Sequence, residues 1–348
     1  MTASFLLLLI VLTAVLAALL TLGLRAYALA HQVLDIPNAR SSHLVPTPRG
    51  GGLAIVISFV VAILVLFGFR YISVHVTLAL VGASGIVALI GFIDDHAHIA
   101  ARWRFLAHFS AAAWVLYWIG TPLLDLPGGP INLGCIGVVL CTLYLVWMLN
   151  LYNFMDGIDG IAGIEAITVT LSGTALSMCF VIPLSSSGSA VVVLALLAAA
   201  ATLGFLVWNF PPAKIFMGDA GSGFLGILMG TLSLMAGLEE PVLFWSWVIL
   251  LGVFVVDATV TLFRRLAKRQ RLYEAHRSHA YQFAARRLGA HRPVSIAVGL
   301  INLCWLLPLA WIVAAGWISG VLCVLIAYAP LVGLAWYLKA GAAELQTT

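Results

Sequence analysis

Acidic and carboxamide side chains are concentrated in short segments between long apolar stretches. The first segment is Gly91-Phe-Ile-Asp-Asp-His96, in which Asp94 and Asp95 are adjacent. Two neighbouring carboxylates at a membrane boundary repel each other and lose hydration, so they are stable beside a cation, a metal or a hydrogen-bonding network. The alternative is the solvated start of an acidic loop, but acidic residues contribute little to topology. We therefore expect this pair to take part in chemistry.

A second segment carries Asn150, Asn153, Asp156 and Asp159 at a constant spacing of three residues. Residues three apart share one face of a helix, although the two glycines in this segment indicate that part of it is a loop. Carboxamide and carboxylate oxygens suit a hard cation, or the hydroxyls and base of a nucleotide. Helix capping at a loop is the alternative. The complete pattern NxxNxxDGxDG favours a binding site.

A third segment runs from Trp208 to Gly223 and contains Asn209, Lys214 and Asp219. Two prolines end the apolar stretch before it, and Asp219 lies in a glycine-rich turn that opens the next one. The N-terminus of a helix presents free N–H groups, and glycine lets a phosphate approach the backbone closely. An acid in this position can hold a divalent cation that phosphates also bind.

The range 264–293 is basic, with nine Lys or Arg residues against the single acid Glu274. Much of this charge can enforce orientation or bind anionic lipid headgroups. Within it, His276, Arg277 and His279 place two imidazoles and a guanidinium together, as phosphate binding requires. The zinc-protease pattern HExxH is absent, which argues against zinc chemistry here.

Two further features are weaker. Thr47 opens the run Thr47-Pro-Arg-Gly-Gly-Gly52, which alone predicts only a flexible entry to a helix. Asp257 lies inside an apolar stretch, where it either hydrogen-bonds within the bundle or orients the basic loop, and the sequence leaves both readings open.

The elements that must position these residues are membrane helices. Hydrophobic residues make up 63% of the 348-residue chain and charged residues only 9%, whereas soluble domains contain about 25% charged residues. Apolar runs of about 20 residues, the length of a spanning helix, predict an all-α, polytopic transmembrane bundle. The eleven predicted spans are 4–24, 52–69, 76–93, 105–119, 131–149, 161–182, 190–208, 222–236, 242–263, 294–315 and 318–338. The runs are continuous rather than alternating, which excludes a barrel.

Charge sets the expected orientation. With eleven spans and the N-terminus outside, only Arg70 of the 17 Lys and Arg residues falls outside, and the C-terminus is cytoplasmic. The net charge of +4 then reflects topology, and we do not expect nucleic-acid binding. A single catalytic domain spanning 1–348 is expected, with its active site formed by five cytoplasmic loops. These loops are 25–51, 94–104, 150–160, 209–221 and 264–293.

Taken together and in this order, the motifs resemble those of the polyprenyl-phosphate N-acetylhexosamine-1-phosphate transferases. This is the MraY/WecA superfamily of glycosyltransferase 4 type, and the resemblance covers nearly the whole chain. It is nearest to the WecA/WbpL-like branch that initiates O-antigen synthesis. The resemblance implies transfer of N-acetylhexosamine-1-phosphate from a UDP-sugar to undecaprenyl phosphate, with release of UMP. It implies an active site facing the cytoplasm, in the bacterial inner membrane among membrane lipids, and is compatible with a homodimer.

The resemblance also implies roles for the motif residues. Mg²⁺, or Mn²⁺ in its place, would be held mainly by Asp219 with help from Asn153. Asp94 and Asp95 would be the catalytic acids. Substrate contacts are expected from Thr47, Arg102, Asn150, Asp156, Asp159, Asn209, Lys214, His276, Arg277 and His279. The physical account agrees, because joining a lipid phosphate to a UDP-sugar brings two anions together and their repulsion must be screened.

Three other activities fit the sequence less well. A peptidoglycan-type phospho-MurNAc-pentapeptide transferase is disfavoured, because members of that type carry consecutive histidines where this chain has His276-Arg-Ser-His279, and lysines where it has Arg102 and Arg104. A transporter would place ionisable groups near mid-membrane and show repeat symmetry. A CDP-alcohol phosphatidyltransferase would require the pattern DGxxAR…GxxxDxxxD, which is not found.

Overall fold

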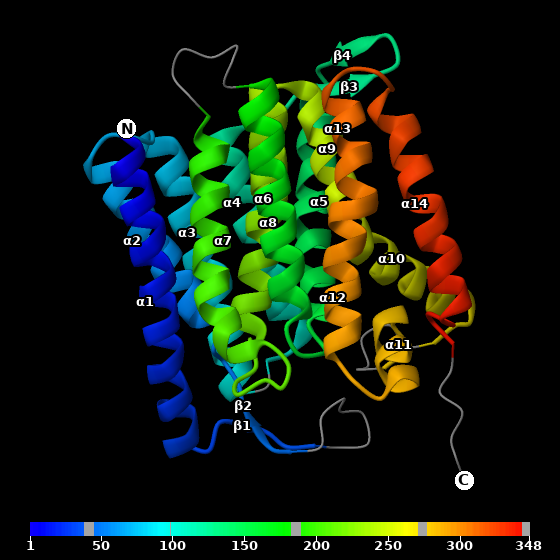
Figure 1. Cartoon of the computed structure of the whole chain (residues 1–348). Coiled ribbons are helices and arrows are strands. Elements are labelled where there is room, and N and C mark those ends of the chain that lie inside the picture. The colour runs from blue at the N-terminus through cyan, green and yellow to red at the C-terminus, as the bar shows by residue number, and fades with distance from the viewer. Residues whose placement is uncertain (38–44, 98, 182–188, 271–276, 343–348) are drawn as a thin grey trace.

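The computed structural model describes residues 1–37, 45–97, 99–181, 189–270 and 277–342. Long helices run side by side as a single bundle (Figure 1). They are α1 (Ala3–Ala30), α2 (Leu53–Gly68), α3 (Val74–His96), α4 (Ala101–Ile119), α5 (Gly134–Met155), α6 (Ile161–Phe180), α7 (Ala190–Asn209), α8 (Asp219–Glu239), α9 (Pro241–Leu250), α10 (Gly252–Ala267), α11 (Ala280–Leu288), α12 (Arg292–Ile301), the π-helix η1 (Asn302–Leu306), α13 (Leu307–Ala314) and α14 (Gly320–Tyr337). Two short antiparallel pairs join β1 (Leu34–Asp35) to β2 (Thr47–Pro48) and β3 (Leu124–Leu126) to β4 (Gly129–Ile131).

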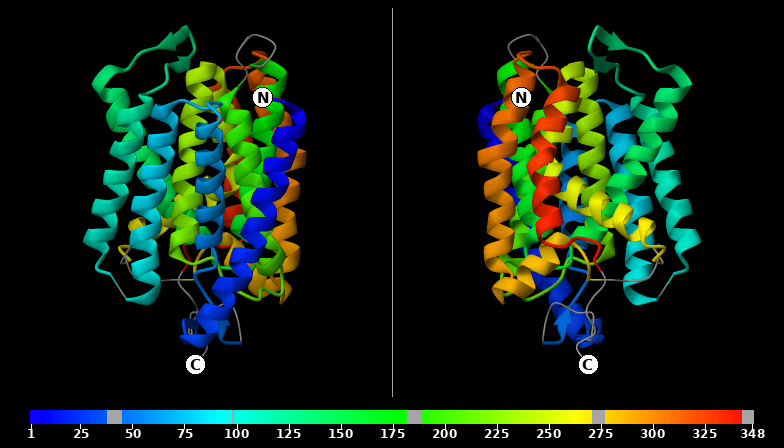
Figure 2. Two further views of the ribbon diagram at one scale, coloured as in Figure 1. Left: turned by 90° about the vertical axis from the view of Figure 1, so that its left-hand side faces the viewer. Right: turned by 90° about the vertical axis from the view of Figure 1, so that its right-hand side faces the viewer.

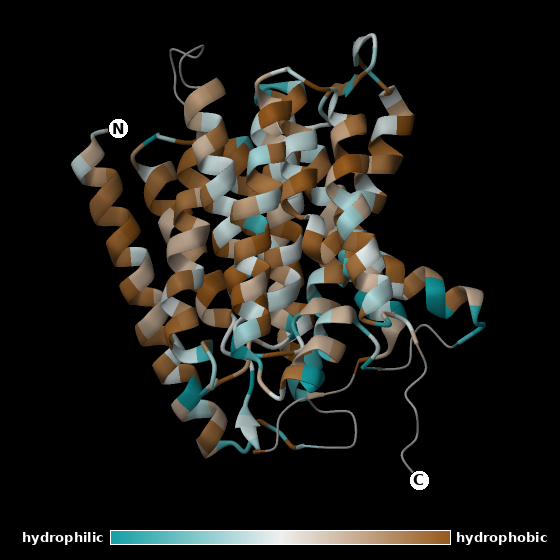
Figure 3. Ribbon diagram, turned by 45° about the vertical axis from the view of Figure 1, so that its right-hand side comes forward, coloured by the Kyte–Doolittle hydropathy of each residue, from teal (hydrophilic) through white to brown (hydrophobic). Residues whose placement is uncertain are grey.

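The bundle is a polytopic membrane protein, as predicted. Among the described residues, eight helices are long and apolar enough to cross a membrane, or nine if the bent pair α9–α10 forms one span. Each of the eleven predicted runs lies on a helix or on consecutive helical segments. Helix α2 is apolar but has only 16 residues, so the number of spans remains a prediction. Apolar residues cover the middle of the bundle, and hydrophilic residues gather toward the end that carries α11 (Figure 3).

Helix α8 forms the centre of the bundle. Its residues from Ala220 to Gly237 are all buried, and it packs against α3, α5 and α9. Small residues, which let helix backbones approach closely in membranes, occur along much of this helix. Asp219 is therefore the first residue of a helix that is enclosed by other helices.

One predicted span is broken. The run 242–263 forms α9 and α10, which meet at Leu251 with a bend of 68°, and α10 leaves the bundle obliquely (Figure 2). A helix that restarts inside a bundle exposes unpaired N–H groups. The buried carboxylate of Glu165, on α6, lies near one of them, the backbone N–H of Phe254. Glu165 accepts a hydrogen bond from Asn302 Nδ2 at 2.7 Å.

The segments expected on the cytoplasmic side meet at one end of the bundle. Helix α11 and the β1–β2 pair lie at this end, whereas β3–β4 lies at the other (Figure 1). Helix α1 begins at the β3–β4 end, and α14 ends at the α11 end. Helix α1 continues to Ala30, beyond the predicted end of the first span. The two ends of the described chain thus lie at opposite ends of the bundle.

Candidate active site

A cavity of about 840 Å³ opens between α3, α4, α5, α8, α10 and α11. Its lining contains both polar and apolar side chains. The polar lining comprises Asp94, Arg104, His108, Asn150, Asn153, Asp219, His279, Tyr281 and Gln282. The apolar lining includes Val87, Ile90, Phe105, Leu143, Val146, Trp147, Leu149, Phe154 and Leu262. Such a cavity can hold both a charged group and part of a hydrocarbon chain.

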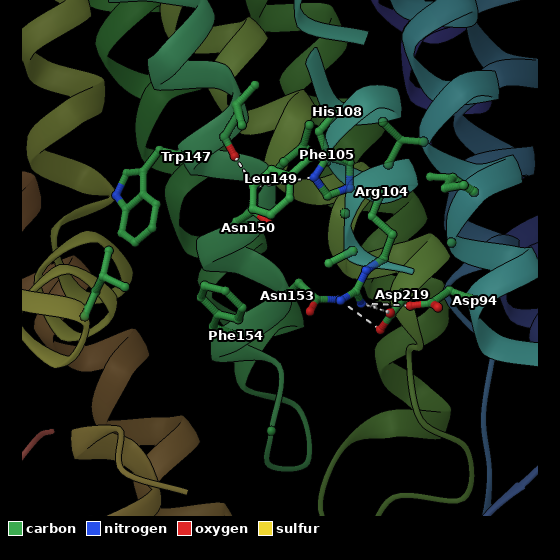
Figure 4. A pocket seen from close by; sticks show the side chains of 18 of the residues that line it. Asp94, Arg104, Phe105, His108, Trp147, Leu149, Asn150, Asn153, Phe154 and Asp219 are labelled. Atoms are coloured by element: carbon green, nitrogen blue, oxygen red, sulfur yellow. Dashed lines mark hydrogen bonds and ion pairs between the residues drawn. The ribbon is translucent and has the colours of Figure 1, made fainter. Parts of the chain in front are cut away.

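Two carboxylates and one guanidinium meet at the polar end of the cavity. Arg104 Nη1 lies 2.9 Å from Asp94 Oδ2 and 3.8 Å from Asp219 Oδ2. Asn153 Nδ2 donates to Asp219 Oδ1 at 2.9 Å and to Ser222 Oγ at 3.2 Å. Figure 4 shows these side chains converging from α3, α4, α5 and α8. The segments around Asp94, Asn153 and Asp219, far apart in the sequence, are thereby brought to one point as predicted.

Close packing of α3 on the start of α8 creates this meeting point. A Cβ added to Gly91 would lie 2.4 Å from the backbone nitrogen of Ala220. A side chain there would push α3 away from α8, and with it Asp94 away from Asp219. Glycine at this position is thus required by the close approach of the two helices.

Asp95 does not line the cavity. It is 4% exposed and faces the loop before α8, where its Oδ1 accepts a hydrogen bond from the backbone N–H of Asp219 at 3.2 Å. Arg49 Nη2 donates to the backbone oxygen of Asp95. Gly218 has φ +76°, and a Cβ there would lie 2.5 Å from Asp95 Oδ2. Asp95 therefore fixes the turn that presents Asp219.

The predicted series of polar residues divides between helix and loop. Asn150 and Asn153 lie on α5 and line the cavity, and Asn150 Nδ2 donates to Val146 O at 2.7 Å. Helix α5 ends at Met155, so Asp156 and Asp159 belong to the following loop and do not continue the same face. Gly160, with φ +73°, adopts a left-handed conformation at the end of this loop, directly before α6 begins.

Asp159 and Asn209 hold loops together outside the cavity lining. Asp159 Oδ2 accepts from the Ala213 N–H at 2.9 Å, and Asp159 Oδ1 lies 3.2 Å from His291 Nδ1. Asn209 is buried and accepts from the Gly160 N–H at 3.0 Å while donating to the Ile215 carbonyl at 2.9 Å. These contacts fix the loop from α7 to α8.

Asp156 lies half-buried in the loop after α5. Burial, together with the nearby carboxylates of Asp219 and Asp95, raises the pKa of Asp156 well above its ordinary value. This crowding of negative charge is the condition in which a bound cation is favourable. Asp156 is not among the residues lining the cavity.

Of the basic loop, the structure brings His279 to the cavity. His279 is buried, and its ring stacks near those of Phe154 and Tyr281, with centroids 6.3 Å and 5.7 Å away. Arg277 is not part of the lining, and its carbonyl accepts from Arg286 Nη2 at 3.0 Å. His276 lies outside the described residues.

Three other predicted contacts lie away from the cavity lining. Thr47 is buried in β2 and donates to the Val45 carbonyl at 2.9 Å. Arg102 lies over the ring of Trp103, and Lys214 over the ring of Trp208. None of these three lines the cavity.

The sequence prediction chose Arg102 and missed Arg104. Helix α4 begins at Ala101, so Ala101, Arg104, Phe105 and His108 follow the spacing of one helix face, and all four line the cavity. Arg102 belongs to another face. Helical periodicity counted from Ala101, the first residue of α4, would therefore have placed Arg104 on the face that lines the cavity.

The donor set suits a hard divalent cation such as Mg²⁺. Mg²⁺ is commonly bound by one or two carboxylates together with water and substrate phosphates, rather than by an all-protein cage. Asp219, Asp94 and the amide of Asn153 form such a partial set. Among the described residues, no group of three or more His, Cys, Asp or Glu side chains is arranged to hold a metal, so the remaining ligands would be phosphate oxygens and water.

Comparisons with known proteins agree with this geometry. The family model described as Glycosyl transferase family 4 matches residues 76–237. A probable undecaprenyl-phosphate N-acetylglucosaminyl 1-phosphate transferase from Bacillus subtilis (strain 168) is 32% identical over 278 residues, which is 77% of this chain and 74% of the relative. A phospho-N-acetylmuramoyl-pentapeptide-transferase from Clostridium beijerinckii is 34% identical over 239 residues, covering 64% of this chain and 70% of the relative.

A decaprenyl-phosphate N-acetylglucosaminephosphotransferase from Mycolicibacterium smegmatis is 36% identical over 232 residues, covering 61% of this chain and 55% of the relative. The matched region contains the motifs around Asp94, Asn153 and Asp219, on which the resemblance rested. The chain belongs to the superfamily of polyprenyl-phosphate N-acetylhexosamine-1-phosphate transferases.

Proposed function

We propose that this protein transfers N-acetylhexosamine-1-phosphate from a UDP-N-acetylhexosamine to undecaprenyl phosphate and releases UMP. The observation that carries the proposal is the cluster of Asp94, Arg104, Asn153 and Asp219 in a cavity that is also lined by apolar side chains. The cluster suits two phosphate groups, and the apolar part of the lining suits the first isoprene units of the lipid. The names of the relatives support the same class of reaction.

In the reaction, an oxygen of the lipid phosphate attacks the β-phosphorus of the UDP-sugar. A new P–O bond forms to the lipid, the bond from the β-phosphorus to the bridging oxygen breaks, and the electron pair leaves with UMP. A phosphate dianion is already nucleophilic, so we favour direct attack over an enzyme-linked intermediate. The protein's task is then to align two anions and to lower their repulsion.

The cavity offers named groups for that task. Arg104 presents a guanidinium, which binds phosphate oxygens in a fixed geometry. Mg²⁺ would be held by Asp219 and Asn153, with Asp94 adjacent, and would supply positive charge to the diphosphate. Asp94, held by Arg104, faces the same space and can orient the lipid phosphate through the bound cation and Arg104. His279 lies across the cavity, where it can contact the diphosphate or the sugar.

We further propose that the site opens to the cytoplasm of a bacterial inner membrane and that the product initiates O-antigen or a related envelope glycan. The basic segments gather at the end of the bundle that bears the cavity, and positive charge is retained on the cytoplasmic side of membrane proteins. The interrupted histidine pattern near His279 supports a simple UDP-N-acetylhexosamine over a peptide-bearing donor.

The proposal is tested by incubating purified enzyme with undecaprenyl phosphate and a panel of UDP-sugars. The panel contains N-acetylglucosamine, N-acetylgalactosamine, N-acetylquinovosamine, N-acetylfucosamine and muramoyl-pentapeptide donors. UMP and lipid-linked product are measured together. Turnover with an N-acetylhexosamine donor supports the proposal, whereas turnover with the muramoyl-pentapeptide donor alone would assign the enzyme to peptidoglycan precursors.

A further inference from the structure

Asp257 lies on α10, beyond the bend between α9 and α10, and is 6% exposed. Its two carboxylate oxygens bind the start of α11. Oδ1 accepts from the Ala280 N–H at 2.8 Å, and Oδ2 accepts from the Tyr281 N–H at 3.0 Å. These are N–H groups of the first turn of α11, which have no partner within that helix. A buried carboxylate at a helix N-terminus is also favoured by the helix dipole.

The first turn of α11 is held on its other side by α5. The Tyr281 hydroxyl donates to the Phe154 carbonyl at 3.0 Å, and Phe154 directly follows Asn153 on α5. Gln282 Oε1 accepts from the His279 N–H at 3.2 Å. Three residues of the cavity lining, His279, Tyr281 and Gln282, are therefore fixed between Asp257 and the end of α5.

The same contacts exclude one means of binding phosphate. Helix N-termini commonly bind phosphate through their free N–H groups. In α11 those of Ala280 and Tyr281 are already bonded to Asp257. Helix α11 therefore presents side chains to the cavity, above all the imidazole of His279. The Nδ1 atom of His279 lies 3.4 Å from Asp257 Oδ1.

We infer that Asp257 is a positioning residue for the transfer reaction. Through both carboxylate oxygens it sets where α11 begins, and so where His279 and Gln282 face the substrate. This inference rests on the proposed function for its kinetic consequence, but not for its structural one. Asp257→Asn keeps the size of the side chain but leaves it only one acceptor oxygen, so one N–H of the first turn of α11 loses its partner.

Glu239 provides a matched control. This carboxylate caps the start of α7 in the same manner, accepting from Ser189 Oγ at 2.6 Å and from the Val191 N–H at 3.4 Å. It ends α8, whereas Asp219 begins α8 at the cavity. Glu239→Gln therefore removes a half-buried helix-capping carboxylate far from the reaction site.

The experiment combines hydrogen exchange with kinetics on the full-length enzyme in lipid nanodiscs. In Asp257→Asn, the amides of peptides covering 280–288 should exchange at least about tenfold faster, and kcat should fall at least about tenfold. Glu239→Gln should leave both quantities within about threefold of wild type. Because Asp257 acts through α11, adding Asp257→Asn to His279→Gln should slow the enzyme by less than about threefold further.

Unchanged exchange over 280–288 in Asp257→Asn would overturn the inference. Faster exchange with normal turnover would also overturn it. So would a double variant whose loss of kcat equals the product of the losses in Asp257→Asn and His279→Gln. Failure of the proposed function is recognised separately, because wild-type enzyme would then form no lipid-linked sugar phosphate. The exchange measurement would still test the contact between Asp257 and α11.

Discussion

Asp94 and Asp95 are neighbours in the sequence but face different structures. Asp94 lines the cavity and accepts a hydrogen bond from Arg104 at 2.9 Å, whereas Asp95 is buried and accepts one from the backbone N–H of Asp219 at 3.2 Å. Adjacent helical residues point about 100° apart, so one face of α3 serves the cavity and the other holds the loop before α8. The two carboxylates therefore have different tasks.

Substitution of this pair should separate turnover from stability. Asp94→Asn should lower kcat strongly with little change in the unfolding temperature in detergent, since its side chain faces the cavity. Asp95→Ala should lower both, because it leaves the Asp219 N–H without its acceptor, at a cost of about 1–3 kcal/mol. Steady-state kinetics and thermal unfolding measure the two effects. Equal losses of stability in both variants, or a raised donor KM with normal kcat in Asp94→Asn, would refute the division.

Activity should require a divalent cation held at Asp219. We expect chelation to abolish turnover and Mg²⁺ or Mn²⁺ to restore it, and Asp219→Asn to lower kcat by about two orders of magnitude. Asp125→Asn, in the β3–β4 pair at the other end of the bundle, is the control and should remain active. Normal turnover in chelator-treated enzyme would remove the metal from the account.

Arg104 and Arg102 form a matched pair on α4. Arg104 binds Asp94 within the cavity, and Arg102 lies over Trp103 outside it. Loss of a charge-assisted hydrogen bond costs about 1.5–3 kcal/mol, so Arg104→Ala should reduce kcat/KM by about 10- to 100-fold. Arg102→Ala should stay within about threefold of wild type. Similar effects at both positions would indicate that only the total charge of the segment matters.

The basic loop should show a similar contrast. His279 lines the cavity, so His279→Ala should reduce kcat/KM for the UDP-sugar at least about tenfold. Arg277 lies off the cavity wall, and we now expect a smaller effect from Arg277→Ala. Arg287, which donates to the Tyr337 hydroxyl at 3.0 Å, is a better control than Arg286, because Arg286 contacts the Arg277 carbonyl. Accessibility labelling confirms an unchanged topology, and equal small effects at all three sites would reduce the loop to an anchor.

Much of the architecture could be predicted from the sequence because each membrane helix is encoded by a continuous run of apolar residues. The convergence of Asp94, Asn153 and Asp219 also followed from the sequence, since each motif lies where its apolar run meets the side of the membrane expected to be cytoplasmic. The orientation of α4 did not follow, because it depends on where the helix begins. The bend between α9 and α10 lies beside Glu165, which is distant in the sequence, and the tasks of Asp159 and Asn209 depend on backbone partners. Such long-range hydrogen bonds leave no periodic pattern in the chain.

Labelled phosphate tests the central claim most directly. Purified enzyme is given undecaprenyl phosphate and UDP-N-acetylglucosamine carrying radioactive phosphorus at either the α or the β position. We expect the β-label to enter the lipid product together with the sugar and the α-label to be released as UMP. Release of both labels as UDP, with the sugar alone on the lipid, would show attack at the sugar carbon and contradict transfer of a sugar-1-phosphate.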